Sequence, residues 1–192
     1  GCIAENHNWR DGIGPRASRP TKVNTSYRED HGIETNEFGT HEFMGFCRQV
    51  GAEPYLCANI ASNTPMELFN WMEYCNMPRG ITTLTRQRES NGSPEPFGIK
   101  YWGMGNENTL HGGLMTPEDY CAAYCRFMAP TYTVSKDCYF IASGPIWNNV
   151  EWSRRFFENY IARGGWEGKH LEGYSLHHYS VDPEGHDDTF SE

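Results

Sequence analysis

The chain has 192 residues, of which 38% are hydrophobic and 14% aromatic, which is enough for one core and predicts a single domain. Its formal net charge of −9 argues against nucleic acid or an anionic membrane surface as a partner, whereas a neutral ligand is compatible with it. No apolar run approaches the length that crosses a bilayer.

The seven cysteines are scattered, form no CxxC pair and mostly occupy apolar positions of predicted elements. We therefore expect buried free thiols in a reducing compartment rather than a disulfide framework or a zinc site. This expectation favours a cytoplasmic location and leaves secretion open.

The first segment, Asn8 to Pro15, reads as a structured loop held by Trp9 and Asp11. It either borders a pocket or packs over the rim of the fold, and we favour packing. No Gly-x-Ser-x-Gly elbow follows anywhere in the chain, so a serine hydrolase is not indicated.

A helix and a strand come next. Thr40 is the expected cap of the helix, and Gly51 is its expected end. Helical spacing predicts its buried face: Phe43, Phe46, Cys47 and Val50. The short apolar segment 54–60 is then expected to form a buried strand.

The segment Thr64-Pro65-Met66-Glu67 predicts the start of the second helix, because it is a capping-box pattern with proline at the first helical position. Its predicted buried stripe consists of Leu68, Trp71, Met72 and Cys75. Residues 77–98 are polar and rich in Pro, Gly and Arg, so we expect a long loop there. Residues 99–104 form the second predicted strand.

Two more units complete the pattern. Thr116-Pro117 begins a helix with a predicted stripe of Tyr120, Ala123, Tyr124 and Phe127, and residues 139–143 follow as a strand. The last helix, residues 152–163, stops at Gly164 and is expected to bury Phe156, Phe157, Tyr160 and Ile161. Residues 173–177 form the last predicted strand.

Alternating strands and helices predict an α/β fold with a parallel sheet, either doubly wound or part of an eightfold barrel. Polar residues follow three of the strands: Asn59, the pair Asn106-Glu107, and the segment from His177 to Tyr179. The carboxyl ends of parallel strands are where α/β folds build active sites, so these residues are the candidate site.

The segment Gly103-Met104-Gly105-Asn106-Glu107 is the sharpest signal, because two glycines let the backbone turn and present an amide and a carboxylate at a strand end. Glu107 is interpreted either as a general acid/base, with Asn106 binding a substrate hydroxyl, or as a solvated loop residue or helix cap. A dinucleotide fingerprint is weaker, because Asn108 stands where its third glycine would be.

Strand alternation sends His177 and Tyr179 to one side and His178 to the other. His177 and Tyr179 then either line a pocket, where they orient a carboxylate or sugar hydroxyls, or are amphipathic core residues. His186, Asp187 and Asp188 lie nearby, but no metal-ligand spacing is present and we expect no metal.

Several of these segments, in the same order along nearly the whole chain, resemble glycoside hydrolase family 51, the α-L-arabinofuranosidases. The matching segments are Gly1-Cys2, residues 8–15, 34–43, 51–54, Asn59, 73–76, 99–107 and 175–179. The Asn-Glu pair alone would indicate only the wider clan of barrel glycosidases.

The resemblance implies part of a (β/α)8 barrel, from about the end of strand 2 through strand 6, acting on arabinose-containing oligo- or polysaccharides such as hemicellulose. It implies that Glu107 is the acid/base, and that the substrate-binding residues are Asn106, His177, Tyr179, Asn59 and Cys2. It also implies an oligomeric parent enzyme and no metal or organic cofactor.

Two departures matter. The family's nucleophile, a Glu at the end of the seventh strand, matches no residue of this chain, and the segment from Tyr27 to Gly32 lacks the tryptophan usual there. Both ends of the chain look cut. We therefore expect residues 1–192 to be an internal piece of one catalytic barrel domain that is inactive by itself, because retaining hydrolysis needs two carboxyl groups about 5 Å apart. Exposed sheet edges should also make the piece poorly soluble.

Two alternatives stay open. One is another clan-A barrel glycosidase, such as an endoglucanase or a β-xylosidase. The other is a sugar-binding protein that lacks the nucleophile and does not hydrolyse its ligand.

Overall fold

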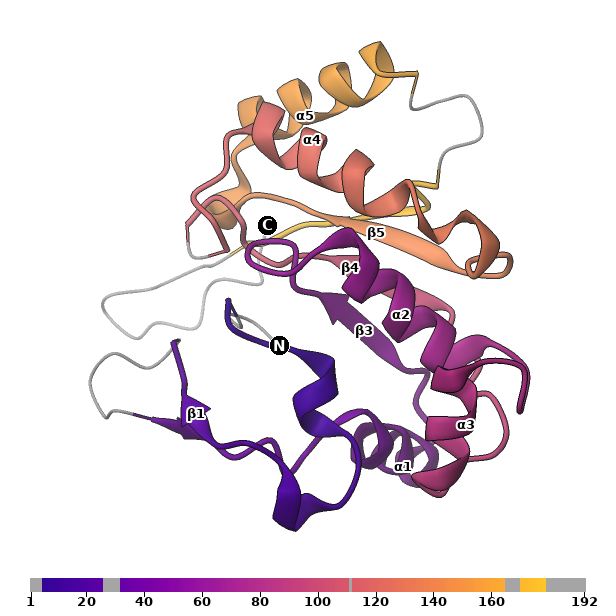
Figure 1. The fold of residues 1–192 in the computed structure, drawn as a ribbon. Helices are drawn as coiled ribbons and strands as arrows, with labels where there is room; N and C mark the ends of the chain where they lie inside the picture. Colours follow the sequence, from indigo (N-terminus) through magenta and orange to yellow (C-terminus); the bar gives the residue numbers. More distant parts are fainter. Residues whose placement is uncertain (1–4, 26–31, 111, 165–169, 179–192) are drawn as a thin grey trace.

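The computed structural model describes residues 5–25, 32–110, 112–164 and 170–178 (Figure 1). Its main sheet has four parallel strands in the order β3 (Tyr55–Ala58), β4 (Tyr101–Met104), β5 (Tyr139–Ser143) and β6 (Gly173–Ser175). A doubly wound sheet contains a point where the strand order reverses. The four described strands follow one another in chain order without such a reversal, as in a sector of a barrel.

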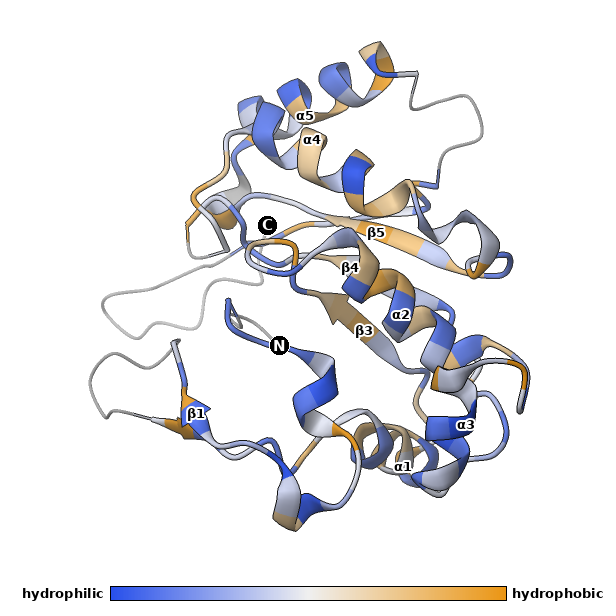
Figure 2. Cartoon of the chain, viewed as in Figure 1, coloured by the Kyte–Doolittle hydropathy of each residue, from blue (hydrophilic) through white to orange (hydrophobic). Residues whose placement is uncertain are grey.

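The helices are α1 (Thr40–Val50), α2 (Pro65–Asn76), α3 (Thr83–Ser90), α4 (Pro117–Met128) and α5 (Val150–Ala162). Helices α2, α4 and α5 lie along one face of the sheet (Figure 1). On that face Trp102, Met104 and Phe140 are fully buried. Apolar residues gather on the strands and on the inner helix faces, and the outer side of α5 is mostly hydrophilic (Figure 2). The hydrophobic core therefore lies between the helices and one face of the sheet.

The other face of the sheet is only partly covered by the described residues. Tyr55 and Tyr139 are 45% and 47% exposed, and the Tyr139 ring stacks on Tyr101 of the neighbouring strand at 5.6 Å. Strand alternation explains the difference, because Leu56 and Phe140, the next residues along β3 and β5, point to the helix-covered face.

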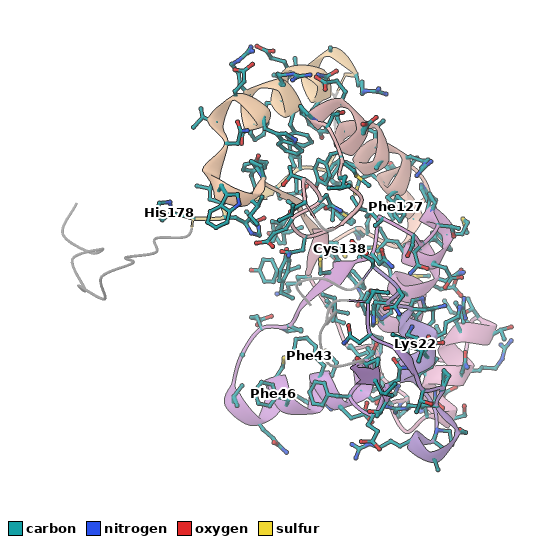
Figure 3. The ribbon with its side chains drawn as sticks, turned by 90° about the vertical axis from the view of Figure 1, so that its left-hand side faces the viewer. Lys22, Phe43, Phe46, Phe127, Cys138 and His178 are labelled. Atoms are coloured by element: carbon teal, nitrogen blue, oxygen red, sulfur yellow. The ribbon has the colours of Figure 1, made fainter. Side chains whose placement is uncertain are left out.

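Helix α1 ends as predicted at Gly51, whose φ is 69°, but its cap is Gly39 rather than Thr40. The predicted buried face is wrong for Phe46, which is 52% exposed (Figure 3), and for Val50, which is 56% exposed. The reason is that Thr40 accepts a hydrogen bond of 3.1 Å from the Trp71 indole. This contact turns Thr40, Met44 and Cys47, spaced at i, i+4 and i+7, toward the core.

The stripe predicted for α2 is confirmed, since Leu68, Trp71, Met72 and Cys75 are all buried. Thr64 accepts from the Glu67 backbone N–H at 3.3 Å, which is one half of the predicted capping box. The other half is not formed, because the Glu67 carboxylate instead accepts hydrogen bonds from Trp9 and Arg10.

The stripe predicted for α4 is also confirmed, since Tyr120, Ala123, Tyr124 and Phe127 are all buried. The stripe predicted for α5 is partly wrong. Phe156 and Tyr160 are buried, but Phe157 and Ile161 are 36% and 56% exposed. Helix α5 packs through Trp152, Phe156 and Tyr160 at a spacing of four, which places Ile161 on its outer side.

The long loop predicted for residues 77–98 is wrong, because α3 lies within it. Thr82 caps this helix by accepting from the Thr85 N–H at 3.1 Å. Arg88 is fully buried and donates to four backbone carbonyl oxygens, those of Tyr74, Met77, Ser93 and Pro94. Helix α3 is therefore held by one buried guanidinium rather than by an apolar stripe, which is why hydrophobic periodicity did not indicate it.

The N-terminal segment packs down as predicted. Trp9 is 2% exposed and stacks on Trp71 at an interplanar angle of 5°. The segment continues through two short 3-10 turns, Trp9–Gly12 and Arg16–Ser18, into an antiparallel hairpin of β1 (Lys22–Val23) and β2 (Ile33–Glu34) that the sequence did not indicate. Arg19 then ties this segment to α1 through two hydrogen bonds to the Glu42 carboxylate, at 2.9 and 3.2 Å. Burial by itself would raise the pKa of Glu42, but hydrogen bonds from Arg19 and the Gly39 N–H lower it to about 2.

All six cysteines in the described part of the chain are free thiols, and four of them are buried, in agreement with the sequence pattern. No described helix combines the length and the apolar character that crossing a membrane requires.

Candidate active site

The two glycines at the end of β4 serve different purposes. Gly105 has a φ of 76°, and its N–H donates to the Ala58 carbonyl of β3 at 3.0 Å. A Cβ on Gly105 would collide with the Asn108 side chain and would lie 2.9 Å from Ile60. Gly103 instead leaves room for the Tyr55 ring, which a Cβ there would strike. The predicted tight turn is confirmed at Gly105.

Glu107 follows this turn and is almost fully buried, with 3% of its surface exposed. Its φ of 47° lies in the left-handed region, which costs a non-glycine residue free energy. The Glu107 N–H donates to the Ser143 hydroxyl at the end of β5 (3.0 Å), and its carbonyl accepts from the Leu110 N–H at 3.0 Å. Glu107 is therefore neither a solvated loop residue nor a helix cap; its backbone is fixed against the neighbouring strand.

His177 reaches Glu107 from the end of β6, 70 positions along the chain. Its Nδ1 lies 3.0 Å from Glu107 Oε1, and both side chains are shielded, at 14% and 4% exposure. The other ring nitrogen, Nε2, lies 3.2 Å from the Ser175 hydroxyl. In the structure, His177 contacts a carboxylate, as in the first of the two interpretations of this residue.

Two residues that the sequence did not single out support this arrangement. The Tyr120 hydroxyl, from α4, donates to the Met104 carbonyl at 2.7 Å and accepts from the Ser143 N–H at 2.6 Å. Burial raises the pKa of Tyr120 well above its usual range, so the phenol remains a proton donor. It thereby joins the ends of β4 and β5. Ser143 could have been noticed as a polar residue ending a strand, whereas Tyr120 looks like any core residue of a helix stripe.

A cavity of about 360 Å³ lies between the N-terminal segment and the ends of β3 and β4, and its lining includes Gly105 and Asn108, on either side of Glu107 in the chain, but not Glu107 or His177. Asn106 and Asn59 both line it. The Asn59 side chain also organises its rim: its amide donates to the carbonyls of Glu5 and His7, and its oxygen accepts from the Ala61 N–H. Asn59 therefore both holds the N-terminal segment in place and lines the cavity.

His7 and Trp9 line the same cavity from the N-terminal side. Burial, together with the positive charge of Lys22, lowers the pKa of His7, so its imidazole is neutral at pH 7. In the parts of the chain that the structure describes, no three His, Cys, Asp or Glu side chains are grouped to hold a metal ion.

The structure therefore brings Glu107 and His177 into contact and places Asn106 and Asn59 at the adjoining cavity. Cys2 and Tyr179, the other two expected site residues, lie outside the described residues, as do His186, Asp187 and Asp188 and the segment from Tyr27 to Gly32 apart from its last residue. The chemistry available is that of one buried carboxyl group with a histidine partner, next to a cavity lined with amides and aromatic rings.

Comparison with known proteins agrees with this geometry. The model of the α-L-arabinofuranosidase 1 domain matches residues 1–190. An intracellular exo-α-L-arabinofuranosidase of Bacteroides ovatus is 37% identical over 184 residues, which are 94% of this chain and 34% of that protein. The α-L-arabinofuranosidase C of Emericella nidulans is 42% identical over 107 residues, 56% of this chain and 20% of that protein.

Solved structures match over the same region. The family 51 arabinofuranosidase of Xanthomonas axonopodis pv. citri has a TM-score of 0.83 and 32% identity, covering 96% of this chain and 36% of its own. An α-L-arabinofuranosidase of Thermotoga maritima, solved as an arabinose complex, has a TM-score of 0.74 and 34% identity, covering 83% of this chain and 32% of its own. This chain spans about a third of the length of these relatives. It belongs to glycoside hydrolase family 51, the family of the α-L-arabinofuranosidases.

Proposed function

We propose that the full-length protein containing this chain is a retaining glycoside hydrolase that releases terminal α-L-arabinofuranosyl residues from arabinose-containing oligo- or polysaccharides. Glu107 is its general acid/base. The observation on which this rests is the buried Glu107 carboxyl group, held 3.0 Å from His177 at the carboxyl end of the parallel strands. The arabinose complex of the Thermotoga maritima relative supports the choice of sugar.

In the first step, protonated Glu107 gives its proton to the glycosidic oxygen while the bond from that oxygen to the anomeric carbon breaks. A second carboxylate, from outside this chain, bonds to the anomeric carbon and the leaving group departs as an alcohol. In the second step, the Glu107 carboxylate takes a proton from water, and the oxygen of that water displaces the enzyme carboxylate. Glu107 is then protonated again, and the sugar is released with its configuration retained.

His177 and Ser175 suit this double role. When Glu107 is ionised, His177 donates from Nδ1 to the carboxylate and accepts the Ser175 hydroxyl proton at Nε2. When Glu107 is protonated, its other oxygen, Oε2, carries the proton that passes to the glycosidic oxygen, while Nδ1–H still donates to Oε1. The same hydrogen bond from His177 therefore holds the Glu107 side chain in both states.

Asn106, Asn59, His177, Tyr179 and Cys2 are proposed to surround the arabinofuranosyl ring. Support comes from the cavity that Asn106 and Asn59 both line, since Asn106 directly precedes Glu107 in the chain. Amide groups donate and accept hydrogen bonds at once, which suits sugar hydroxyls.

We further propose that residues 1–192 are one part of a single catalytic (β/α)8 barrel and have no turnover alone. The four-stranded sheet leaves the outer edges of β3 and β6 without a partner among the described residues, and the matched relatives are about three times longer. A barrel closes both edges with further strands. The nucleophile is expected on one of them.

The test uses the full-length protein and a panel of chromogenic α-L-arabinofuranosides, β-D-xylosides and β-D-glucosides. We expect cleavage of the arabinofuranoside, with the first product retaining its anomeric configuration in a proton NMR time course. Glu107→Gln should lower kcat/KM by about a thousandfold or more for a substrate with a poor leaving group. An inverted product, or selective cleavage of the xyloside or glucoside, would refute the proposal. Binding of arabinofuranosides without hydrolysis would favour a sugar-binding role.

A further inference from the structure

The loops that follow β4 and β5 expose large apolar side chains. Leu110 and Leu114, in the loop after Glu107, are 40% and 72% exposed. Trp147, in the loop after β5, is 61% exposed, and Val150 at the start of α5 is 72% exposed. Exposed apolar side chains on loops beside a catalytic group are typical of a binding surface.

These two loops are fixed to each other at Glu107 and again two residues beyond it. The Glu107 N–H bonds to the Ser143 hydroxyl at 3.0 Å, and the Ile146 N–H bonds to the Thr109 hydroxyl at 3.1 Å. The Trp147 backbone follows directly on the second of these bonds. The tryptophan is therefore held in a loop that is attached two residues beyond the acid/base.

The Trp147 backbone is itself strained, with φ 65° and ψ 26°. A non-glycine residue in this region costs free energy and persists only where its surroundings impose it. Here Pro145 fixes the chain on one side, and Asn149 on the other caps α5 by accepting from the Trp152 N–H at 3.0 Å. The outcome is an indole ring that remains mostly exposed instead of joining the core.

The chemistry of the proposed reaction locates the leaving group. A general acid must face the glycosidic oxygen, so the sugar beyond that oxygen extends past Glu107 over the loops that adjoin it. We propose that Trp147 is the platform on which the first sugar of the leaving group lies, with the C–H face of a pyranose ring against the indole. This inference rests on the proposed function and adds a determinant of preference for the leaving group.

The test compares two substrates of the full-length enzyme: methyl α-L-arabinofuranoside, whose leaving group has no ring, and an oligosaccharide with an arabinofuranosyl group on a pyranose. Trp147→Ala should lower the ratio of kcat/KM for the oligosaccharide to kcat/KM for the methyl glycoside by about three- to tenfold. Trp147→Gly, which relieves the positive φ, should lower this ratio as much as Trp147→Ala does, because the indole ring and not the backbone conformation binds the leaving group. The matched control is Tyr132→Ala, an 80% exposed aromatic between α4 and β5, at the opposite end of the strands.

A ratio that stays at the wild-type value in both Trp147 variants would overturn the inference, and so would a glycine variant that restores the wild-type ratio. A matching fall in the ratio with Tyr132→Ala would also overturn it. If the wild-type enzyme cleaves neither substrate, the proposed function itself has failed and the inference with it. Cleavage of both with an unaltered ratio refutes only the role of Trp147.

Discussion

His177→Ala tests the core of the proposed site. The substitution removes the imidazole whose Nδ1 lies 3.0 Å from Glu107 Oε1, next to a carboxyl group that is 4% exposed in the wild-type protein. We expect Glu107 to lose its fixed orientation in both protonation states, whereas its backbone stays in place through the Ser143 hydroxyl.

The magnitude follows from the hydrogen bond. A buried hydrogen bond to a charged group contributes about 1.5–3 kcal/mol, and kcat/KM should fall by about ten- to a hundredfold if that orientation is needed in the transition state. The loss should be larger for an alkyl leaving group than for 4-nitrophenolate, because a poor leaving group depends on proton donation by Glu107.

The assay is kcat/KM of the full-length enzyme for alkyl and 4-nitrophenyl α-L-arabinofuranosides. His178→Ala is the control, because His178 is exposed and lies at the edge of the molecule where the described chain ends (Figure 3). A loss within twofold for both substrates, or an equal loss for both, would refute a role of His177 through Glu107.

Three further predictions concern the framework of the site. Because the pKa of Glu42 is lowered to about 2 from 4.5, its contribution to stability is present above pH 4.5 and fades as the pH falls toward 2. Glu42→Gln should therefore lower the melting temperature at pH 7 and have a shrinking effect below pH 4.5, and an effect that does not change with pH would contradict this. Arg88→Ala leaves four buried carbonyl oxygens without their donor and should destabilise the protein by about 3–5 kcal/mol in denaturant unfolding, whereas Arg86→Ala on the exposed side of α3 should cost under about 1 kcal/mol. Gly105→Ala places a Cβ on a residue whose φ is 76° and into the side chains around it, so kcat should fall. The control is Gly51→Ala, which has open space around its Cβ and should affect stability alone. Equal kcat for both variants would argue against a role of the Gly105 turn.

Local signals identified most of the elements. Proline after threonine fixed the starts of α2 and α4, and apolar spacing gave their buried faces, because each helix packs its whole stripe against one sheet. The same reasoning failed for Phe46 in α1 and Ile161 in α5, where a shift of one helical position decides which side is buried. It also failed for α3, whose stability comes from Arg88 and not from apolar periodicity.

The sequence by itself determined which strand end bears Glu107, the proposed acid/base, because Gly105 and Glu107 lie two positions apart in one turn. Only the tertiary structure decided what surrounds that carboxyl group. His177 and Ser143 lie 70 and 36 positions away and meet Glu107 because parallel strands in register end at one edge of the sheet. Strand register and helix packing depend on many weak contacts between segments that are far apart in the sequence, so no single segment predicts them.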